Sequence, residues 1–251
     1  MSSEIPSFNK TENKEQSQEI KRFTFEQVEE VNKKLSELSR KLRDKGYRNG
    51  HLSLTLKDYD GETRRFGIGG GMGYDATAFI PDQVVAALAL ADYDFDKEEV
   101  FDFSDEKLSK PLVGLKILDL GCGVEPEFSY IARRLGAEMW TVDVVPASEF
   151  EPLEVNDDGE SIDENASAFH IQVDLNSPDA VRTILEKAHG RFNFVTEAHL
   201  STGTTRTVDG RREDYAAYGQ EIAKEILIDE GVYQKVDPFT PQVQHVSSLK
   251  Y

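Results

Sequence analysis

The stretch LKILDLGCGVEPEF, residues 115–128, decides the fold that we expect for this chain. Residues 115–120 have the length and the apolar character of a buried β-strand, and two closely spaced glycines follow them. Gly121 permits a sharp turn, and Gly123 lets the backbone approach a ligand because it has no Cβ. A strand that ends in such a turn and leads into a helix is typical of the ligand-binding edge of a parallel sheet.

Strands and helices alternate along the chain after residue 111. This alternation predicts a mostly parallel, doubly wound, Rossmann-like α/β sheet that helices cover on both faces. Besides 115–120, we expect strands at 139–145, 168–175, 191–200 and 231–236, and helices at 126–135, 178–189 and 212–229.

The preceding part of the chain predicts a helix–hairpin–helix extension of the sheet. An amphipathic helix begins after Thr24, a hairpin turns at Asp60-Gly61, and a short buried helix covers 81–91. We expect the acidic stretch 91–107 to be a surface connection. The predicted organisation is a disordered tail (1–22), an N-terminal cap region (23–111) and a ligand-binding domain (112–251).

Composition narrows the function classes. Acidic residues outnumber basic residues by 47 to 29, giving a formal net charge of −18, so nucleic acid and anionic membranes are not expected partners. No apolar run is long enough for a membrane span and no signal peptide is recognisable, so we expect a cytoplasmic protein. The single cysteine, Cys122, excludes an intramolecular disulfide and a cysteine-based zinc cage, and no metal site is predicted.

The residues after the glycine turn disfavour a phosphate ligand. A dinucleotide-binding loop would place glycine at position 126, which is Pro126, and Glu125 and Glu127 would face the pyrophosphate. A cationic ligand without phosphate fits the strand ends better. Asp119 can receive an ammonium group, Asp143 ribose hydroxyls and Asp174 an adenine amino group.

Segment 115–200 resembles the class I S-adenosylmethionine (SAM)-dependent methyltransferases. ILDLGCG is similar to their first motif, WTVDVV to the second, HIQVDL to the third, and FNFVTEAHL to the fourth strand. The resemblance implies SAM as the cofactor. The residues that it assigns to cofactor binding are Asp119, Gly121, Cys122, Gly123, Asp143, Val144, Asp174, Leu175 and Thr196.

The resemblance also implies transfer of the SAM methyl group to an oxygen or nitrogen atom. The acidic composition favours a small-molecule acceptor. His199, Glu197 and Tyr74 are the candidate catalytic residues. A histidine that only caps or lines the strand end is the more ordinary interpretation of His199, and the glycine-rich loop around Tyr74 could equally lie away from the ligand. Transfer from a sulfonium requires mainly alignment and exclusion of water, so an essential acid or base is not required.

Two departures from the family pattern keep other functions open. Glu125 replaces the usual third glycine, and only about twenty residues follow residue 231, so the usual C-terminal strand hairpin is shortened to one strand. A non-catalytic binding or interaction module would explain both departures. A nicotinamide-dependent oxidoreductase is a further alternative, which Pro126 and the paired glutamates disfavour. The sequence does not predict an oligomeric state.

Overall fold

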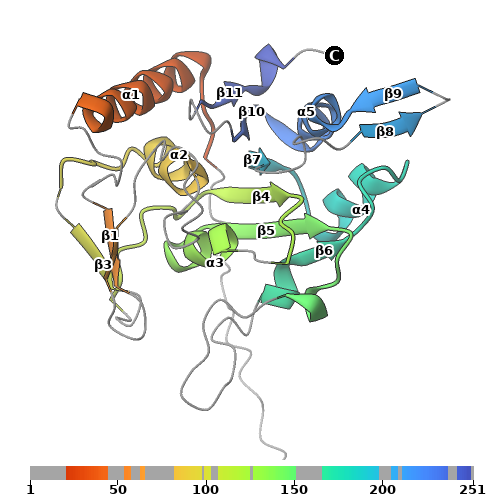
Figure 1. Cartoon of the computed structure of the whole chain (residues 1–251), viewed down its shortest axis with the longest axis horizontal. Coiled ribbons are helices and arrows are strands. Elements are labelled where there is room, and N and C mark those ends of the chain that lie inside the picture. The colour runs from red at the N-terminus through yellow and green to blue at the C-terminus, as the bar shows by residue number, and fades with distance from the viewer. Residues whose placement is uncertain are drawn as a thin grey trace, which may run out of the picture.

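Six strands form one central sheet in the computed structural model (Figure 1). Their order is β11-β10-β7-β4-β5-β6, with every neighbouring pair parallel except β10 and β11. The strands are β4 (Lys116–Leu120), β5 (Glu138–Asp143), β6 (His170–Gln172), β7 (Phe192–Glu197), β10 (Leu227–Lys235) and β11 (Gln244–His245). The structure describes residues 21–44, 54–57, 63–65, 82–97, 99–102, 107–124, 127–150, 166–197, 205–208, 211–236 and 242–249.

The strand order reverses beside β4, which gives the sheet a topological switch point. From β4 the chain moves outward through β5 to β6 and then returns to place β7 on the other side of β4. Open α/β sheets bind ligands at the carboxyl ends of the strands that flank such a point. The predicted Rossmann-like sheet is therefore confirmed, and the glycine turn that follows β4 lies at its switch point.

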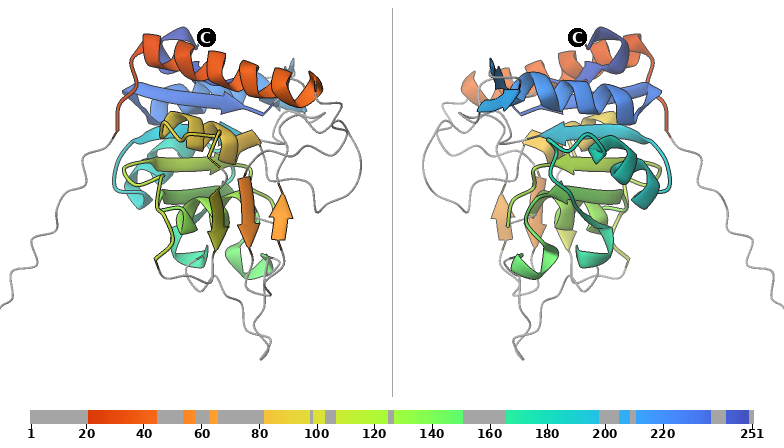
Figure 2. Two further views of the ribbon diagram at one scale, coloured as in Figure 1. Left: turned by 90° about the vertical axis from the view of Figure 1, so that its left-hand side faces the viewer. Right: turned by 90° about the vertical axis from the view of Figure 1, so that its right-hand side faces the viewer.

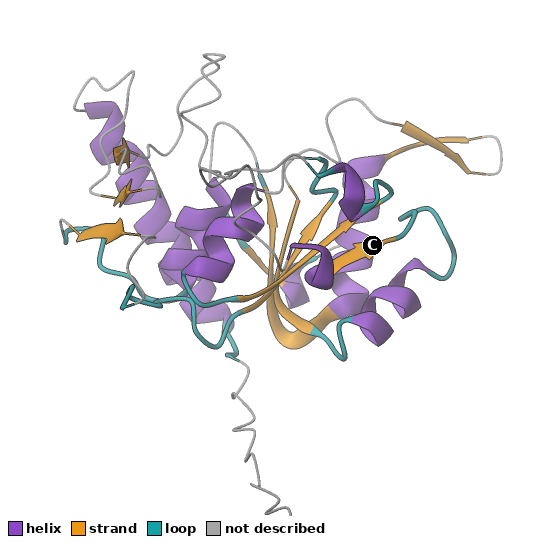
Figure 3. Ribbon diagram, turned by 90° about the horizontal axis from the view of Figure 1, so that it is seen from below, coloured by secondary structure: helices purple, strands orange, loops and turns teal. Residues whose placement is uncertain are grey.

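Helices cover both faces of the sheet (Figure 3). One apolar cluster joins α1, α2 and α3 to Ile117 and Phe194 on one face, and a second joins α4 and α5 to Leu118 and Val195 on the other. Strand residues point alternately to the two faces, so neighbours such as Ile117 and Leu118 belong to different clusters. The helices are α1 (Phe25–Asp44), α2 (Asp82–Leu90), α3 (Glu127–Arg134), α4 (Ala180–Lys187) and α5 (Tyr215–Ile226).

The N-terminal helix and hairpin follow the sequence prediction. Thr24 and Gln27 form a reciprocal cap at the start of α1, because each side chain accepts the backbone N–H of the other at 3.3 and 2.8 Å. The predicted hairpin is the antiparallel pair of β1 (Leu54–Lys57) and β2 (Thr63–Arg65).

The acidic stretch 91–107 is not simply the surface connection that we expected. It contains β3 (Glu99–Asp102), which pairs parallel with β1 and completes a small sheet of order β2-β1-β3. Phe101 of this strand is fully buried and packs against Tyr93 with ring centroids 5.6 Å apart. The buried aromatic side chains of this stretch, rather than its acidic residues, decide its structure.

The predicted helix 212–229 is too long at both ends. Its first residues belong to a hairpin of β8 (Thr205–Val208) and β9 (Arg211–Asp214), and its last belong to β10, which starts at Leu227. β10 carries a register irregularity between Leu227 and Val232 where it pairs with β7. Gly231 lies in this irregular part, and a Cβ there would come within 2.9 Å of Ile228 O.

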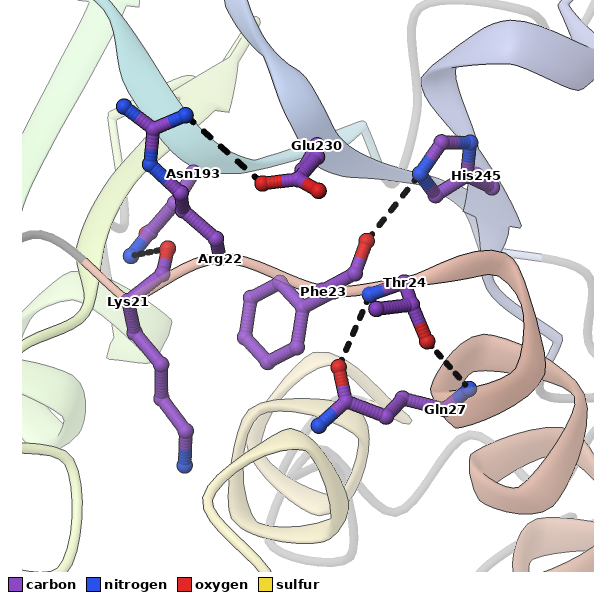
Figure 4. Close-up of polar contacts among 8 residues, drawn as sticks. All are labelled: Lys21, Arg22, Phe23, Thr24, Gln27, Asn193, Glu230 and His245. Atoms are coloured by element: carbon purple, nitrogen blue, oxygen red, sulfur yellow. Dashed lines mark hydrogen bonds and ion pairs between the residues drawn. The ribbon is translucent and has the colours of Figure 1, made fainter.

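Residues 21–24, which we call the strap, are held by hydrogen bonds to residues of β7, β10 and β11 and to the turn before β4 (Figure 4). Lys21 N–H donates to Gly114 O (3.2 Å), and Phe23 N–H donates to Glu230 O (2.9 Å). Asn193 Nδ2 donates to Lys21 O, and His245 Nε2 donates to Phe23 O, both at 3.0 Å. The strap therefore holds the start of α1 in place.

The side views show α1 lying along the same side of the molecule as β10 and the C-terminal segment (Figure 2). Phe23, α1 and α2 share one apolar cluster with β4 and β7, so the cap region and the sheet have a continuous core. The division into residues 23–111 and 112–251 stays a prediction. None of the described helices is long and apolar enough to cross a membrane.

Candidate functional site

The glycine turn after β4 has the left-handed backbone that its sequence requires. Gly121 and Gly123 have φ values of +70° and +67°, which side chains other than glycine rarely adopt. Gly121 N–H donates to Val142 O at 2.8 Å, which fixes the turn to the neighbouring strand β5. A Cβ built on Gly123 would meet no atom of the described residues within 4 Å, so among these residues this position borders open space.

Asp143, at the end of β5, holds the other side of the turn. Its Oδ2 accepts the N–H of Gly123 at 2.9 Å, and its Oδ1 accepts the N–H of Val145 at 3.0 Å. Each carboxylate oxygen has a second lone pair for a ligand hydroxyl. Asp143 thus has a structural role in shaping the turn that the sequence motif alone did not reveal.

A row of polar side chains crosses the sheet beneath the turn. Thr141, Asp119, Thr196 and Gln234 lie directly opposite one another on β5, β4, β7 and β10, and all four are buried. Directly opposed residues point to the same face of a sheet, here the face that α2 covers. We call these four residues the polar row.

His170 of β6 extends the polar row at its β5 end. Its Nε2 lies 2.8 Å from Val145 O, and its Nδ1 lies 3.0 Å from the hydroxyl of Thr141. The carbonyl can only accept, so Nε2 carries the proton, and Nδ1 accepts the Thr141 hydrogen in the neutral ring. Burial lowers the pKa of His170, which favours this neutral form.

Asp119 is the buried carboxyl group at the centre of the polar row. Gln83 of α2 donates from Nε2 to Asp119 Oδ1 at 3.1 Å. Burial is the main reason that the pKa of Asp119 is raised to about 8. The charges of Asp143 and Glu197 raise it further, whereas the hydrogen bond from Gln83 opposes the shift. The carboxyl of Asp119 is therefore mostly protonated near neutral pH and takes up a negative charge only at a substantial cost.

The thiol of Cys122 is under the influence of the same acidic groups. Burial raises its pKa first, and the charges of Asp119 and Asp143 raise it further. A thiol that stays protonated is a poor nucleophile. Cys122 therefore acts as a small packing residue of the turn, as its sequence context favours.

Three other predicted cofactor residues differ in placement. Asp174 is exposed two residues beyond β6, and its Oδ1 accepts two hydrogen bonds at 2.9 Å from the backbone and side chain of Asn176. Leu175 is buried in the cluster on the α4 and α5 face, whereas Val144 is 63% exposed beside the glycine turn. Of the three predicted carboxylates, Asp119 and Asp143 thus lie together at the turn, whereas the side chain of Asp174 binds its neighbour Asn176.

Of the three candidate catalytic residues, the structure describes Glu197. Glu197 is buried at the end of β7, one residue after Thr196, so it points to the α5 face of the sheet and not to the face of Asp119. It lies against Gly219 of α5 and beside the hydroxyl of Tyr233, whose pKa is raised by burial first and then by Glu197. Tyr74 and His199 lie outside the described residues.

A cavity of about 420 Å³ lies away from the glycine turn, between α1 and the C-terminal segment. Phe25 and Glu29 line it from α1, and Gln242 and His245 line it from the C-terminal segment. The polar groups of Asn32 and His245, which also line it, already bind the backbone of Val243 and Phe23. The chemistry at the turn therefore identifies the site better than the volume of this cavity does.

The solved structures that resemble the chain at low identity include the following two. A SAM-dependent methyltransferase from Agrobacterium tumefaciens is 19% identical with a TM-score of 0.36, and the match covers 69% of this chain and 49% of that one. MycE methyltransferase from the mycinamycin biosynthetic pathway, in complex with Mg and SAH, is 12% identical with a TM-score of 0.31, covering 50% and 28%. Both matched proteins are methyltransferases. The chain thus spans less than half of the length of either protein. No protein-family model and no curated protein sequence matches the chain.

Sequence reasoning missed Gln83, Thr141 and Gln234 as parts of the site. Gln83 directly precedes the apolar run VVAALAL of α2, and a buried amide requires a hydrogen-bond partner. That requirement was the available signal, because it predicts a polar group facing α2. The sequence could not say which group, since Asp119 lies 36 residues away.

Proposed function

We propose that the chain is a SAM-dependent methyltransferase that acts on an oxygen or nitrogen atom of a small-molecule acceptor. The observation that carries the proposal is the acidic surrounding of the glycine turn. Asp119 and Asp143 lie together there, and Glu197 adds to the negative potential that raises the pKa of Asp119. Such a potential repels a pyrophosphate and attracts a sulfonium ion and an ammonium group.

The residues at the turn fit the parts of SAM. Asp119 would hold the ammonium group of the amino-acid tail, because a cation compensates a buried carboxylate. Asp143 would accept the ribose hydroxyls with the lone pairs that Gly123 and Val145 leave available. The open space at Gly123 would let the ligand lie directly against the backbone of the turn. Asp174 remains the residue that we propose to bind adenine.

Bound SAM supplies a methyl group that is already activated by the positive sulfur. The protein then has to orient the acceptor in line with this methyl group and exclude water. His199, Glu197 and Tyr74 stay candidate catalytic residues. The burial of Glu197 against α5 favours a structural role for this one, since a base must reach the proton that it removes.

Ligand binding to the intact 251-residue chain tests the cofactor. Isothermal titration calorimetry should detect binding of SAM and of S-adenosylhomocysteine (SAH) but not of NAD. Asp143→Ala should weaken SAH binding at least about tenfold, because it removes charge-assisted hydrogen bonds. Asp179→Ala, at an exposed position of the α4 N-terminus, is the matched control and should bind as the wild type does. Binding of NAD alone would contradict the proposal.

The acceptor requires a separate experiment. Incubation with radiolabelled SAM and fractionated cell extract should label a low-molecular-weight fraction if the acceptor is a small molecule. Label in protein or nucleic acid would correct the acceptor class. SAH binding without transfer to any fraction would favour the non-catalytic binding module, which Glu125 in place of the third glycine also favours. The cytoplasmic location stays a prediction.

A further inference from the structure

The contact between Gln83 and Asp119 joins the N-terminal cap region to the glycine turn. Gln83 is buried and is the polar residue among the apolar side chains of α2 that face the core. Its amide donates to Asp119 Oδ1 at 3.1 Å, and both side chains are buried on the same face of the sheet. A buried amide that loses its hydrogen-bond partner is left with an uncompensated desolvation cost, so the contact is strongly maintained.

We propose that Gln83 is a positioning residue, which binds Oδ1 of Asp119 and thereby orients Oδ2 toward the ammonium group of the ligand's amino-acid tail. The inference rests on the proposed function and deepens it. It gives α2 a specific task, which is to select a ligand with a charged tail. A neutral donor leaves the charge that Asp119 takes up on ligand binding for the ligand's ammonium group to compensate, whereas a salt bridge at the same oxygen would compete with that group.

The groups around Asp119 explain why a neutral donor matters. Asp143 faces it from the end of β5, Glu197 acts on it from the end of β7, and Cys122 lies in the turn. The two carboxylates favour the protonated form of Asp119, and Cys122 stays neutral. Gln83 on α2 is the neighbour that favours the ionised form. Removing the amide of Gln83 should therefore favour the protonated form of Asp119 and also leave its carboxyl group less fixed in orientation.

Two ligands that differ only in the tail test the inference. SAH carries the amino-acid tail, and 5′-methylthioadenosine lacks it. Gln83→Met keeps the side-chain volume but cannot donate. We expect its affinity for SAH to fall at least about tenfold, while its affinity for methylthioadenosine changes less than about twofold. Asp119→Asn should show the same selective loss, and Asp179→Ala should show none.

Ligand-free NMR provides a readout that does not depend on the cofactor. The side-chain ¹³C shifts of aspartate, recorded against pH, should give a higher pKa for Asp119 in Gln83→Met than in the wild type, because the donor stabilises the charged form. An unchanged pKa overturns the inference. Circular dichroism confirms that the variant is folded.

The outcomes separate the two proposals. If the wild type binds both ligands and Gln83→Met weakens both equally or neither, the positioning role is wrong and the proposed function stands. If the wild type binds neither ligand, the proposed function is wrong, and the ligand part of the inference falls with it. The NMR titration then still decides whether Gln83 controls the ionisation of Asp119.

Discussion

The buried carboxyl of Asp119 makes the stability of the ligand-free protein depend on pH. An unfolded aspartate ionises near pH 4, about its reference value, whereas the folded pKa is about 8. Between these pH values the folded protein keeps a proton that the unfolded chain releases. The free energy of unfolding therefore falls as the pH rises through this window, by up to about 1.4 kcal/mol per pH unit.

Asp119→Asn removes this titration. We expect the difference in melting temperature, variant minus wild type, to increase steadily from about pH 5 to about pH 8 and then to level off, because the wild type loses stability over this range. Each kcal/mol corresponds to about 2–4 °C in a chain of this size. Differential scanning fluorimetry measures the effect, with the exposed Asp229→Asn as control. A difference that is constant across this pH range would show that Asp119 is not buried as described.

The packing of α5 against β7 depends on a glycine. A Cβ on Gly219 would lie 2.7 Å from Cδ of Glu197 and closer still to its Oε2. Alanine normally stabilises a helix by about 1 kcal/mol relative to glycine. Here we expect Gly219→Ala to destabilise the protein by about 1–3 kcal/mol, because the inserted methyl group overpacks the interface. Urea denaturation measures the change in the free energy of unfolding.

A double-mutant cycle identifies the cause. In the Glu197→Ala background the space opens, so Gly219→Ala should become neutral or stabilising. In the Glu197→Gln background the clash remains, so the cost should remain as well. The same cost in all three backgrounds would mean that α5 does not contact Glu197 through Gly219.

The whole molecule unfolds as one unit if its core is continuous. Phe23 of the strap is buried in the same cluster as Ile117 of β4 and Phe194 of β7. We expect Phe23→Ala to lower the free energy of unfolding by about 3–5 kcal/mol, as other buried phenylalanines do. The neighbouring Arg22→Ala removes an exposed ion pair to Glu230 and should cost less than about 1 kcal/mol.

The shape of the unfolding transition tests the domain division. Tryptophan fluorescence reports on β5 through Trp140, and far-ultraviolet circular dichroism reports on all helices. Coincident urea transitions for both probes would show that the cap region and the sheet unfold together. A separate early loss of helix would instead support residues 23–111 as an independent domain.

The sequence by itself determined the sheet, the helices on both of its faces and the glycine turn. Apolar spacing and left-handed glycines act within a few residues, so they can be recognised locally. The tertiary structure alone decided which distant groups meet. The contact of Gln83 with Asp119, the face to which Glu197 points, and the pairing of β3 with β1 each join segments far apart in the chain. Such contacts form because all helices and strands must bury their apolar faces against one another at the same time. This requirement involves the whole chain, so it cannot be recognised in any short stretch of sequence.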